Sequence, residues 1–229
     1  MTTPALLAIS HGTASPDGQA AVAALVDAVA ARLPDVPVRL GHVDVQQPDV
    51  PASLGAIGEG RPVVVVPLLL SAGYHVHVDL VEQTADRADV TIAGALGPDA
   101  RLAGLLARRL GDLHPGPDDA VVLAVAGSSD ERANDDCRAT ARMLAELMDR
   151  PVDVGFLAAA EPRLADAVAA ARTRADRVVV ADYLLAPGYF HDLAVRVAEG
   201  SVVARPLLDD DAPDDALVEL VVDRYRAAR

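Results

Sequence analysis

The chain repeats itself once, at a spacing of 115 residues, and this repeat limits the possible folds more than any other feature. Glycine, leucine and tyrosine recur at this spacing, in the pairs Gly12 and Gly127, Leu69 and Leu184, Gly73 and Gly188, and Tyr74 and Tyr189. Pro48 and Pro162, each before a helical pattern, are 114 residues apart. We interpret the 229 residues as two copies of one unit of ordinary domain size, rather than as a single sheet without duplication.

Within each copy, short apolar runs alternate with longer segments of helical period. The run 63–66 is apolar at every residue, as expected for a strand whose two faces are both covered by helices. Such alternation is typical of α/β proteins with parallel sheets. The expected strands are 5–9, 38–45, 62–69, 90–93, 121–125, 152–157, 177–183 and 202–204, and the expected helices are 19–32, 51–57, 78–87, 99–110, 132–148, 162–172, 192–198 and 213–227.

The segment His114–Pro117 interrupts both patterns. Two prolines and a glycine in four residues are typical of a loop between structural units. We therefore predict an N-terminal lobe at residues 1–115 and a C-terminal lobe, a second copy of the same unit, at residues 118–229.

Composition excludes several classes of function. The formal charge is −14 and all 20 basic residues are arginine, which excludes Schiff-base chemistry and a phosphate-loop lysine. A nucleic-acid partner is not expected, because it requires a basic surface. Cys137 is the only cysteine, so no disulfide can form within the chain. Because no signal-peptide pattern occurs and no apolar run approaches the ~20 residues of a membrane helix, we expect a soluble, cytoplasmic protein without a membrane partner.

Two histidines distinguish the first copy from the second. His11 aligns with Ala126 and His75 with Phe190, so the second copy lacks both imidazoles. Both histidines follow predicted strands, and open parallel sheets bind ligands at the carboxyl ends of their strands. We therefore expect His11, His75 and the nearby His77 to face one cleft, where neutral imidazoles suit a divalent iron, cobalt, nickel or zinc ion. Taken alone, His11 is equally explained as a strand-end histidine bonded to the backbone, and His77 as a solvated loop residue.

For other polar residues, a structural role is the simpler expectation. Asp79 begins a predicted helix and is expected to be its N-cap. His42 and Asp44 alternate along a predicted strand, where they would share one face. His191 lies one residue out of register with His75 in the repeat, so its place in the cleft is left open.

Two motifs in this order resemble those of the sirohydrochlorin chelatases, the ATP-independent class II cobalto- and ferrochelatases. The first is Ser-His-Gly-Thr at 10–13, and the second is Pro-Leu-Leu-Leu-Ser-Ala-Gly-Tyr-His at 67–75, with Asp79 four residues later. The resemblance covers essentially the whole chain, because the family includes two-copy proteins of this length with the histidines in one half. It implies two tandem, three-layer α/β/α lobes of flavodoxin- and chelatase-like fold. Each would have a four-stranded, mainly parallel sheet, and the lobes would face each other across a central cleft.

The resemblance also implies the roles of individual residues. His11 and His75 would be the catalytic pair that binds the metal and helps to remove the two pyrrole protons. His77 would be a third metal ligand or a group that handles protons beside them. The substrate-binding residues expected around these histidines are Ser10, Gly12, Thr13, Gly73 and Tyr74. No organic cofactor is implied, because the divalent metal is itself a substrate, with Fe²⁺ favoured and Co²⁺ next.

Sirohydrochlorin, the partner that the resemblance implies, carries many carboxylates, whereas this chain is strongly acidic. We therefore expect the cleft to be locally less acidic than the chain as a whole. Ser128 and Ser129, which precede a predicted helix in the second copy, are candidates to anchor a substrate carboxylate. Because the two copies can form both lobes of the cleft within one chain, we expect a monomer.

Two other classes of function are compatible with the same residues. A zinc-dependent hydrolase could use His11, His75 and His77 around one metal ion. A metal carrier or tetrapyrrole-binding protein could use the same scaffold without catalysis. Metal insertion into sirohydrochlorin would separate the chelatase from both.

Overall fold

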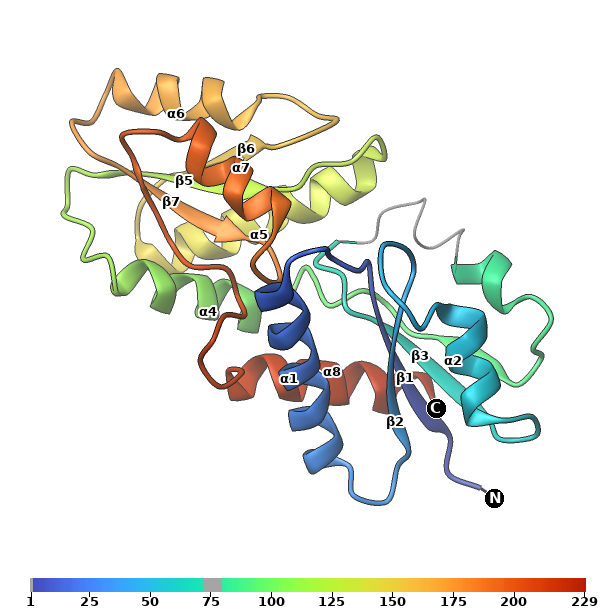
Figure 1. Cartoon of the computed structure of the whole chain (residues 1–229). Helices are drawn as coiled ribbons and strands as arrows, with labels where there is room; N and C mark the ends of the chain where they lie inside the picture. Colours follow the sequence, from blue (N-terminus) through green and yellow to red (C-terminus); the bar gives the residue numbers. More distant parts are fainter. Residues whose placement is uncertain (1, 72–79) are drawn as a thin grey trace.

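The computed structural model describes residues 2–71 and 80–229, which form two four-stranded parallel sheets (Figure 1). The strand orders are β2-β1-β3-β4 and β6-β5-β7-β8, so the two sheets share one topology. We call the parts built around them the first and the second lobe. The strands are β1 (Ala5–Ser10), β2 (Val38–His42), β3 (Val63–Pro67), β4 (Val90–Ile92), β5 (Ala120–Val125), β6 (Val152–Phe156), β7 (Val178–Tyr183) and β8 (Val202–Val203). The helices are α1 (Pro16–Arg32), α2 (Val50–Ile57), α4 (Ala100–Gly111), α5 (Glu131–Met148), α6 (Leu164–Arg172), α7 (Tyr189–Val197) and α8 (Asp215–Ala228).

The central strands are buried along their whole length. Every residue of β1, β3 and β7 is inaccessible to solvent or nearly so. This burial explains their continuous apolar sequences, because helices cover both faces of each sheet. The expected α/β fold with two tandem lobes is therefore confirmed.

Both copies keep the same turn after their first strand. Gly12 and Gly127 have φ values of 95° and 85°, which glycine adopts more readily than other residues. A Cβ at Gly12 would lie 2.1 Å from the Asp44 carbonyl oxygen, and one at Gly127 would lie 2.0 Å from the Ala158 carbonyl oxygen. In each copy the turn therefore requires glycine, because a neighbouring loop approaches its backbone closely.

The last helix of each half packs against the sheet of the other half. Helix α4 contacts β7 and α5, whereas α8 contacts β3 and α1 (Figure 1). Two ion pairs join α4 to α8. Arg101 lies 2.7 Å from Asp223, and Arg108 lies 2.6 Å from Asp214, the N-cap of α8. The predicted lobes at residues 1–115 and 118–229 stay a prediction, and the packing connects α4 to the second sheet and α8 to the first.

Several element boundaries differ from the sequence expectation, most clearly the end of β2 and the starts of α1, at Pro16 rather than at residue 19, and of α7. Strand β2 ends at His42, so the expectation that His42 and Asp44 share a strand face is wrong. The chain turns away beyond this point, and Val45 has a φ of 62°. Helix α7 begins at Tyr189 rather than at residue 192. Its N-cap is Gly188, which makes no side-chain hydrogen bond, so no polar capping residue marks this start in the sequence.

Part of the expected helix at 78–87 and its expected N-cap, Asp79, lie outside the described residues, and residues 80–84 are helical. Among the helices that the structure describes, none has the length and apolar character needed to cross a membrane.

Candidate functional site

The turn that carries His11 leaves the first sheet at the carboxyl end of β1. The His11 carbonyl oxygen accepts a hydrogen bond from the Asp44 N–H at 3.1 Å, and the Thr13 N–H donates to Gln46 Oε1 at 2.8 Å. The loop after β2 therefore fixes the backbone of the turn. His11 itself is exposed, and no hydrogen bond joins its imidazole to another residue in the described part of the chain. The imidazole is thus presented to solvent or to a ligand.

Ser10 supports this turn from inside the protein. Its hydroxyl is hydrogen-bonded to His42 Nδ1 at 2.8 Å, and both residues are buried. Burial lowers the pKa of His42, because the charged imidazolium is less well solvated there. The pair connects the ends of β1 and β2 directly behind His11. Since this bond occupies the Ser10 hydroxyl, the substrate contact expected of Ser10 stays a prediction.

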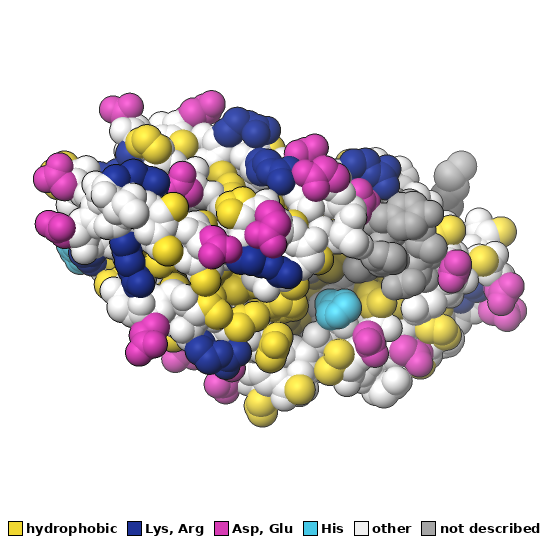
Figure 2. Space-filling view, turned by 90° about the horizontal axis from the view of Figure 1, so that it is seen from above, with side chains coloured by type: hydrophobic (Ala, Val, Ile, Leu, Met, Phe, Trp, Pro, Cys, Tyr) yellow, Lys and Arg dark blue, Asp and Glu magenta, His cyan; other side chains and the backbone are white. Residues whose placement is uncertain are grey.

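Two hollows lie at the carboxyl ends of the outer strands of the first sheet. One, of about 420 Å³, is formed by the loop after β2, at Val43, Asp44, Val45, Gln46, Gln47 and Asp49. The other, of about 820 Å³, lies where the residues after β4 face α5 and α8, and its lining includes Gly97, Asp136 and Arg224. Figure 2 shows hydrophobic side chains on either side of a histidine at this end of the molecule, with charged side chains beside them.

Several predicted site residues lie outside the described part of the chain. These are Gly73, Tyr74, His75 and His77. Among residues 2–71 and 80–229, no three histidine, cysteine or acidic side chains are grouped as a metal site would require. The convergence of His75 and His77 with His11 therefore stays a prediction.

The chain just before that segment is attached to the second lobe. The Tyr183 hydroxyl, at the end of β7, donates to the Leu70 carbonyl oxygen at 2.9 Å and accepts from the Thr140 hydroxyl at 3.3 Å. Gly97 makes this bond possible, because a Cβ there would lie within 2.3 Å of both bonded oxygen atoms. Burial raises the pKa of Tyr183, so the phenol remains protonated and keeps its hydrogen to donate.

Ser128 is used within its own turn. Its N–H donates to Asn134 Oδ1 at 3.0 Å, and its hydroxyl accepts from the Asp130 N–H at 3.0 Å. Ser129 beside it is exposed. Ser128 thus corresponds to Thr13 in the first copy. The Thr13 hydroxyl accepts a hydrogen bond from the N–H of Ser15, the N-cap of α1, in the same way. The carboxylate-anchoring role of the two serines stays a prediction.

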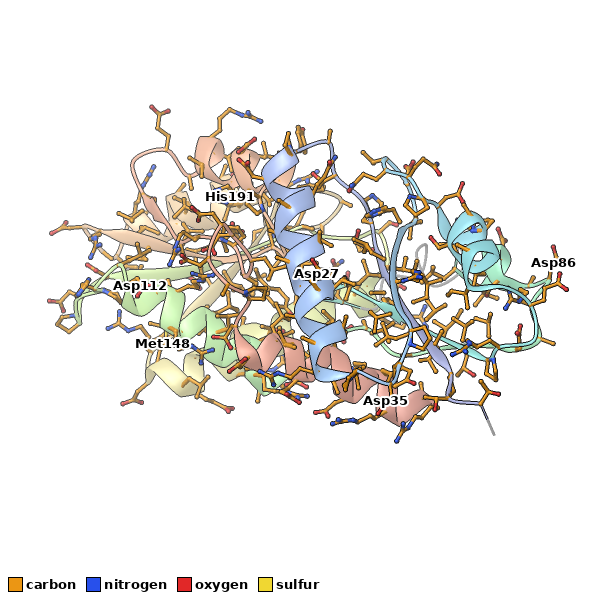
Figure 3. The ribbon with its side chains drawn as sticks, turned by 60° about the horizontal axis from the view of Figure 1, so that its bottom comes forward. Asp27, Asp35, Asp86, Asp112, Met148 and His191 are labelled. Atoms are coloured by element: carbon orange, nitrogen blue, oxygen red, sulfur yellow. The ribbon has the colours of Figure 1, made fainter. Side chains whose placement is uncertain are left out.

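The second lobe borders the His11 turn and the start of α1 through residues 187 and 188. A Cβ at Gly18 would lie 2.2 Å from the Pro187 carbonyl oxygen, and one at Gly188 would lie 3.0 Å from Thr13 Oγ1. Figure 3 shows His191 close to the end of α1 at which that helix begins. His191, whose place sequence reasoning left open, is therefore brought to the boundary between the lobes, beside the turn that carries His11.

Asp182 is a polar residue that the sequence analysis missed. It is fully buried in β7, and its Oδ2 is 2.6 Å from His191 Nδ1. This hydrogen bond raises the pKa of His191, and burial raises the pKa of Asp182. Its other oxygen, Oδ1, has no hydrogen-bond partner among the described residues. The signal in the sequence was a single carboxylate inside an otherwise apolar strand.

The two matching sheets define a two-lobed α/β protein whose fold matches that of solved chelatase structures. The CbiX family model matches the chain twice, at residues 5–113 and at residues 120–227. The chain belongs to the CbiX family, with one copy of the family unit in each half. The resemblance to two-copy sirohydrochlorin chelatases is therefore confirmed.

Solved structures share this fold over nearly the whole chain. SirB from Bacillus subtilis with Fe³⁺ is 21% identical with a TM-score of 0.80, and the match covers 97% of this chain and 94% of that one. SirB from Bacillus subtilis subspecies spizizenii in complex with cobalt is 17% identical with a TM-score of 0.75, at the same coverage. CbiX, described as the terminal enzyme for biosynthesis of siroheme in denitrifying bacteria, is 18% identical with a TM-score of 0.71, over 98% of this chain and 99% of that one. A search of curated protein sequences gives no match.

Proposed function

We propose that this protein inserts a divalent metal ion into sirohydrochlorin without ATP, with Fe²⁺ as the preferred metal and Co²⁺ next. The observation that carries the proposal is the match of both halves to the CbiX family, together with an exposed His11 at the carboxyl end of β1. The names of the similar structures support it, because they describe SirB with Fe³⁺, the sirohydrochlorin chelatase SirB with cobalt, and a terminal enzyme of siroheme biosynthesis.

The proposed site uses His11, His75 and His77. A chelatase must hold its metal loosely enough to release it, so two or three imidazoles with open positions suit the task better than a closed cage of four ligands. His11 and His75 bind the incoming ion and help to remove pyrrole protons, because neutral histidine is basic near neutral pH. His77 is either a third ligand or a neighbour that handles protons.

Iron is favoured because the sequence contains no histidine-rich segment dedicated to cobalt. Imidazole ligands accept both metals, and the similar structures include one with Fe³⁺ and one with cobalt. We propose that the metallated product serves siroheme or cobalamin biosynthesis. We also propose that the protein acts as a monomer in the cytoplasm, with Ser128 and Ser129 binding a substrate carboxylate.

The test is anaerobic incubation of the purified protein with sirohydrochlorin and Fe²⁺ or Co²⁺, followed by absorption spectroscopy. We expect insertion well above the uncatalysed rate, with loss of activity in His11→Ala and in His75→Ala. His114→Ala is the matched control, because His114 is exposed in the loop between the two copies. Insertion no faster than without protein would refute the proposal, and full activity of either site variant would refute the assignment of the site.

The same assay distinguishes the alternative functions. A tetrapyrrole or metal carrier would change the spectrum by binding but would not accelerate insertion. A zinc-dependent hydrolase would bind Zn²⁺ through the same histidines and leave sirohydrochlorin unchanged.

A further inference from the structure

We infer that His191, oriented by Asp182, is a further catalytic residue, whose Nε2 accepts one of the two protons that leave the macrocycle as the metal enters. The inference rests on the proposed function and adds a group from the second lobe to its site. Nothing in the repeat suggested this role, because His191 has no histidine counterpart in the first copy.

The position of Asp182 is decided by the alternation of residues along β7. Val178, Val180 and Asp182 point to the same face, because every second side chain of a strand does. The two valines pack in a cluster with Ala194 of α7, so Asp182 also faces that helix. There it meets His191 at 2.6 Å, inside the protein. Burial of an unpaired carboxylate lowers the stability of the folded protein, and His191 is the partner with which Asp182 is paired.

This arrangement orients the imidazole for accepting a proton. In the neutral ring, Nδ1 donates its hydrogen to the Asp182 carboxylate, and Nε2 therefore carries the lone pair. When Nε2 accepts a proton, the adjacent carboxylate stabilises the resulting imidazolium. The His191 side chain remains 23% exposed while Asp182 is fully buried, so a ligand can reach the ring but not its partner.

His191 also lies where a flat macrocycle can approach it. Residues 187–188, just before it, are packed against Thr13 and Gly18, close to the His11 turn. Tyr189 and Phe190 are 69% and 37% exposed, and they are two of only six aromatic residues in the chain. Their rings contact each other edge to face, with 5.5 Å between the centroids. Exposed, adjacent aromatic rings are suited to contact with the flat face of a macrocycle, while its carboxylates stay at its edge.

A base that does not hold the metal can accept the first proton before the metal ligands are free to do so. Two pyrrole N–H bonds break as the divalent ion binds the four ring nitrogens, and no oxidation state changes. A neutral imidazole has one lone pair, so a histidine that still holds the metal cannot accept a proton at the same time. His191 Nε2 takes the first proton, the imidazolium then releases it to water, and the second proton leaves to a ligand histidine once that histidine has released the metal.

Charges near His191 come from two elements. Asp182 on β7 and Asp192 on α7 both favour its protonated form, and no other described charged group acts on it as strongly. A change of Asp182 therefore alters the basicity of His191 more than any other single substitution, since Asp182 is the partner in direct contact.

The experiment compares His191→Gln and Asp182→Asn with the wild type and with His114→Gln as the matched control. Insertion of Co²⁺ into sirohydrochlorin is followed from about pH 5.5 to about pH 8.5, and Co²⁺ binding is titrated separately without the macrocycle. For His191→Gln we expect kcat to fall by about 10², with KM and Co²⁺ affinity within about twofold of the wild type. For Asp182→Asn we expect a lower kcat, with its acidic limb moved to lower pH because His191 loses its anionic partner.

The outcomes separate this inference from the proposed function. If the wild type inserts no metal, the proposed function fails. If the wild type is active and His191→Gln is as active as His114→Gln, this inference alone is overturned. A parallel loss of Co²⁺ affinity in His191→Gln would make His191 a metal ligand and also overturn it. Because Asp182 is buried, circular dichroism must confirm that Asp182→Asn folds. If Asp182→Asn does not fold, the result for His191→Gln alone decides the inference.

Discussion

The glycine of the His11 turn provides a quantitative test of how the site is held. In Gly12→Ala, the new Cβ would lie 2.1 Å from the Asp44 carbonyl oxygen, on a backbone with φ of 95°. The left-handed backbone alone costs about 1–2 kcal/mol for alanine. The loop after β2 must also move away. Two hydrogen bonds then weaken, those of Asp44 to His11 and of Thr13 to Gln46, at about 1 kcal/mol each.

We therefore expect Gly12→Ala to lower the free energy of unfolding by about 3–4 kcal/mol. The matched control is Gly60→Ala, because Gly60 has a φ of 80° and a Cβ there would meet nothing within 4 Å. In Gly60→Ala, the free energy of unfolding should fall only by the cost of the left-handed backbone conformation, about 1–2 kcal/mol. At about 2–4 °C per kcal/mol for a chain of this length, Tm should fall by roughly 10 °C in Gly12→Ala and by about 4 °C in the control.

Urea and thermal unfolding measure the stability, and Co²⁺ titration measures the effect on the site. Gly12→Ala should bind Co²⁺ more weakly, since the turn that carries His11 has moved, whereas Gly60→Ala should bind it as the wild type does. Equal destabilisation of the two variants would refute the reasoning, because it would show that the contact between the turn and the loop after β2 contributes nothing beyond backbone conformation.

Three further predictions concern packing, pH and the junction of the lobes. Leu106→Ala, in the exchanged helix α4, should lower the free energy of urea unfolding by about 3 kcal/mol, whereas Leu147→Ala, at an exposed position, should change it by less than about 0.5 kcal/mol. The stability difference between wild type and His42→Gln should be larger at about pH 7.5 than at about pH 5.5, because burial lowers the pKa of His42 and its contribution is lost as pH falls. The difference for His191→Gln should be larger at about pH 5.5, because Asp182 raises the pKa of His191 and its contribution is lost as pH rises. Tyr183→Phe should lower the free energy of unfolding by about 1–3 kcal/mol, since a carbonyl oxygen across the lobe boundary loses its donor.

Local patterns predicted the strands and turns well, for identifiable reasons. The runs that became β1, β3 and β7 are apolar throughout because both sheet faces are covered, and such sequences are unambiguous. Gly12 and Gly127 recur at one spacing because both turns need a positive φ and both meet a carbonyl oxygen. Boundaries were less predictable where capping signals were absent, as at Gly188 before α7.

The candidate site was predictable only in part. His11 was identified because its counterpart, Ala126, lacks an imidazole, and the structure exposes His11 at the end of its strand. Asp182 was missed because a strand pattern gives no information about which partner a buried carboxylate meets. Its partner, His191, is nine residues away in another element, and only packing of α7 onto β7 brings the two together.

By itself, the sequence determined that the protein consists of two copies of one α/β unit and that His11 and His75 have no histidine counterpart in the second copy. Repeats, apolar runs and turn residues are properties of neighbouring positions, so they can be read from the chain alone. The exchange of α4 and α8 between the lobes, the contact of residues 187–188 with the His11 turn and the pairing of Asp182 with His191 were decided only by tertiary structure. Each depends on burial between segments far apart or in different elements, and the free energy of such burial is set by the assembled core rather than by any local pattern.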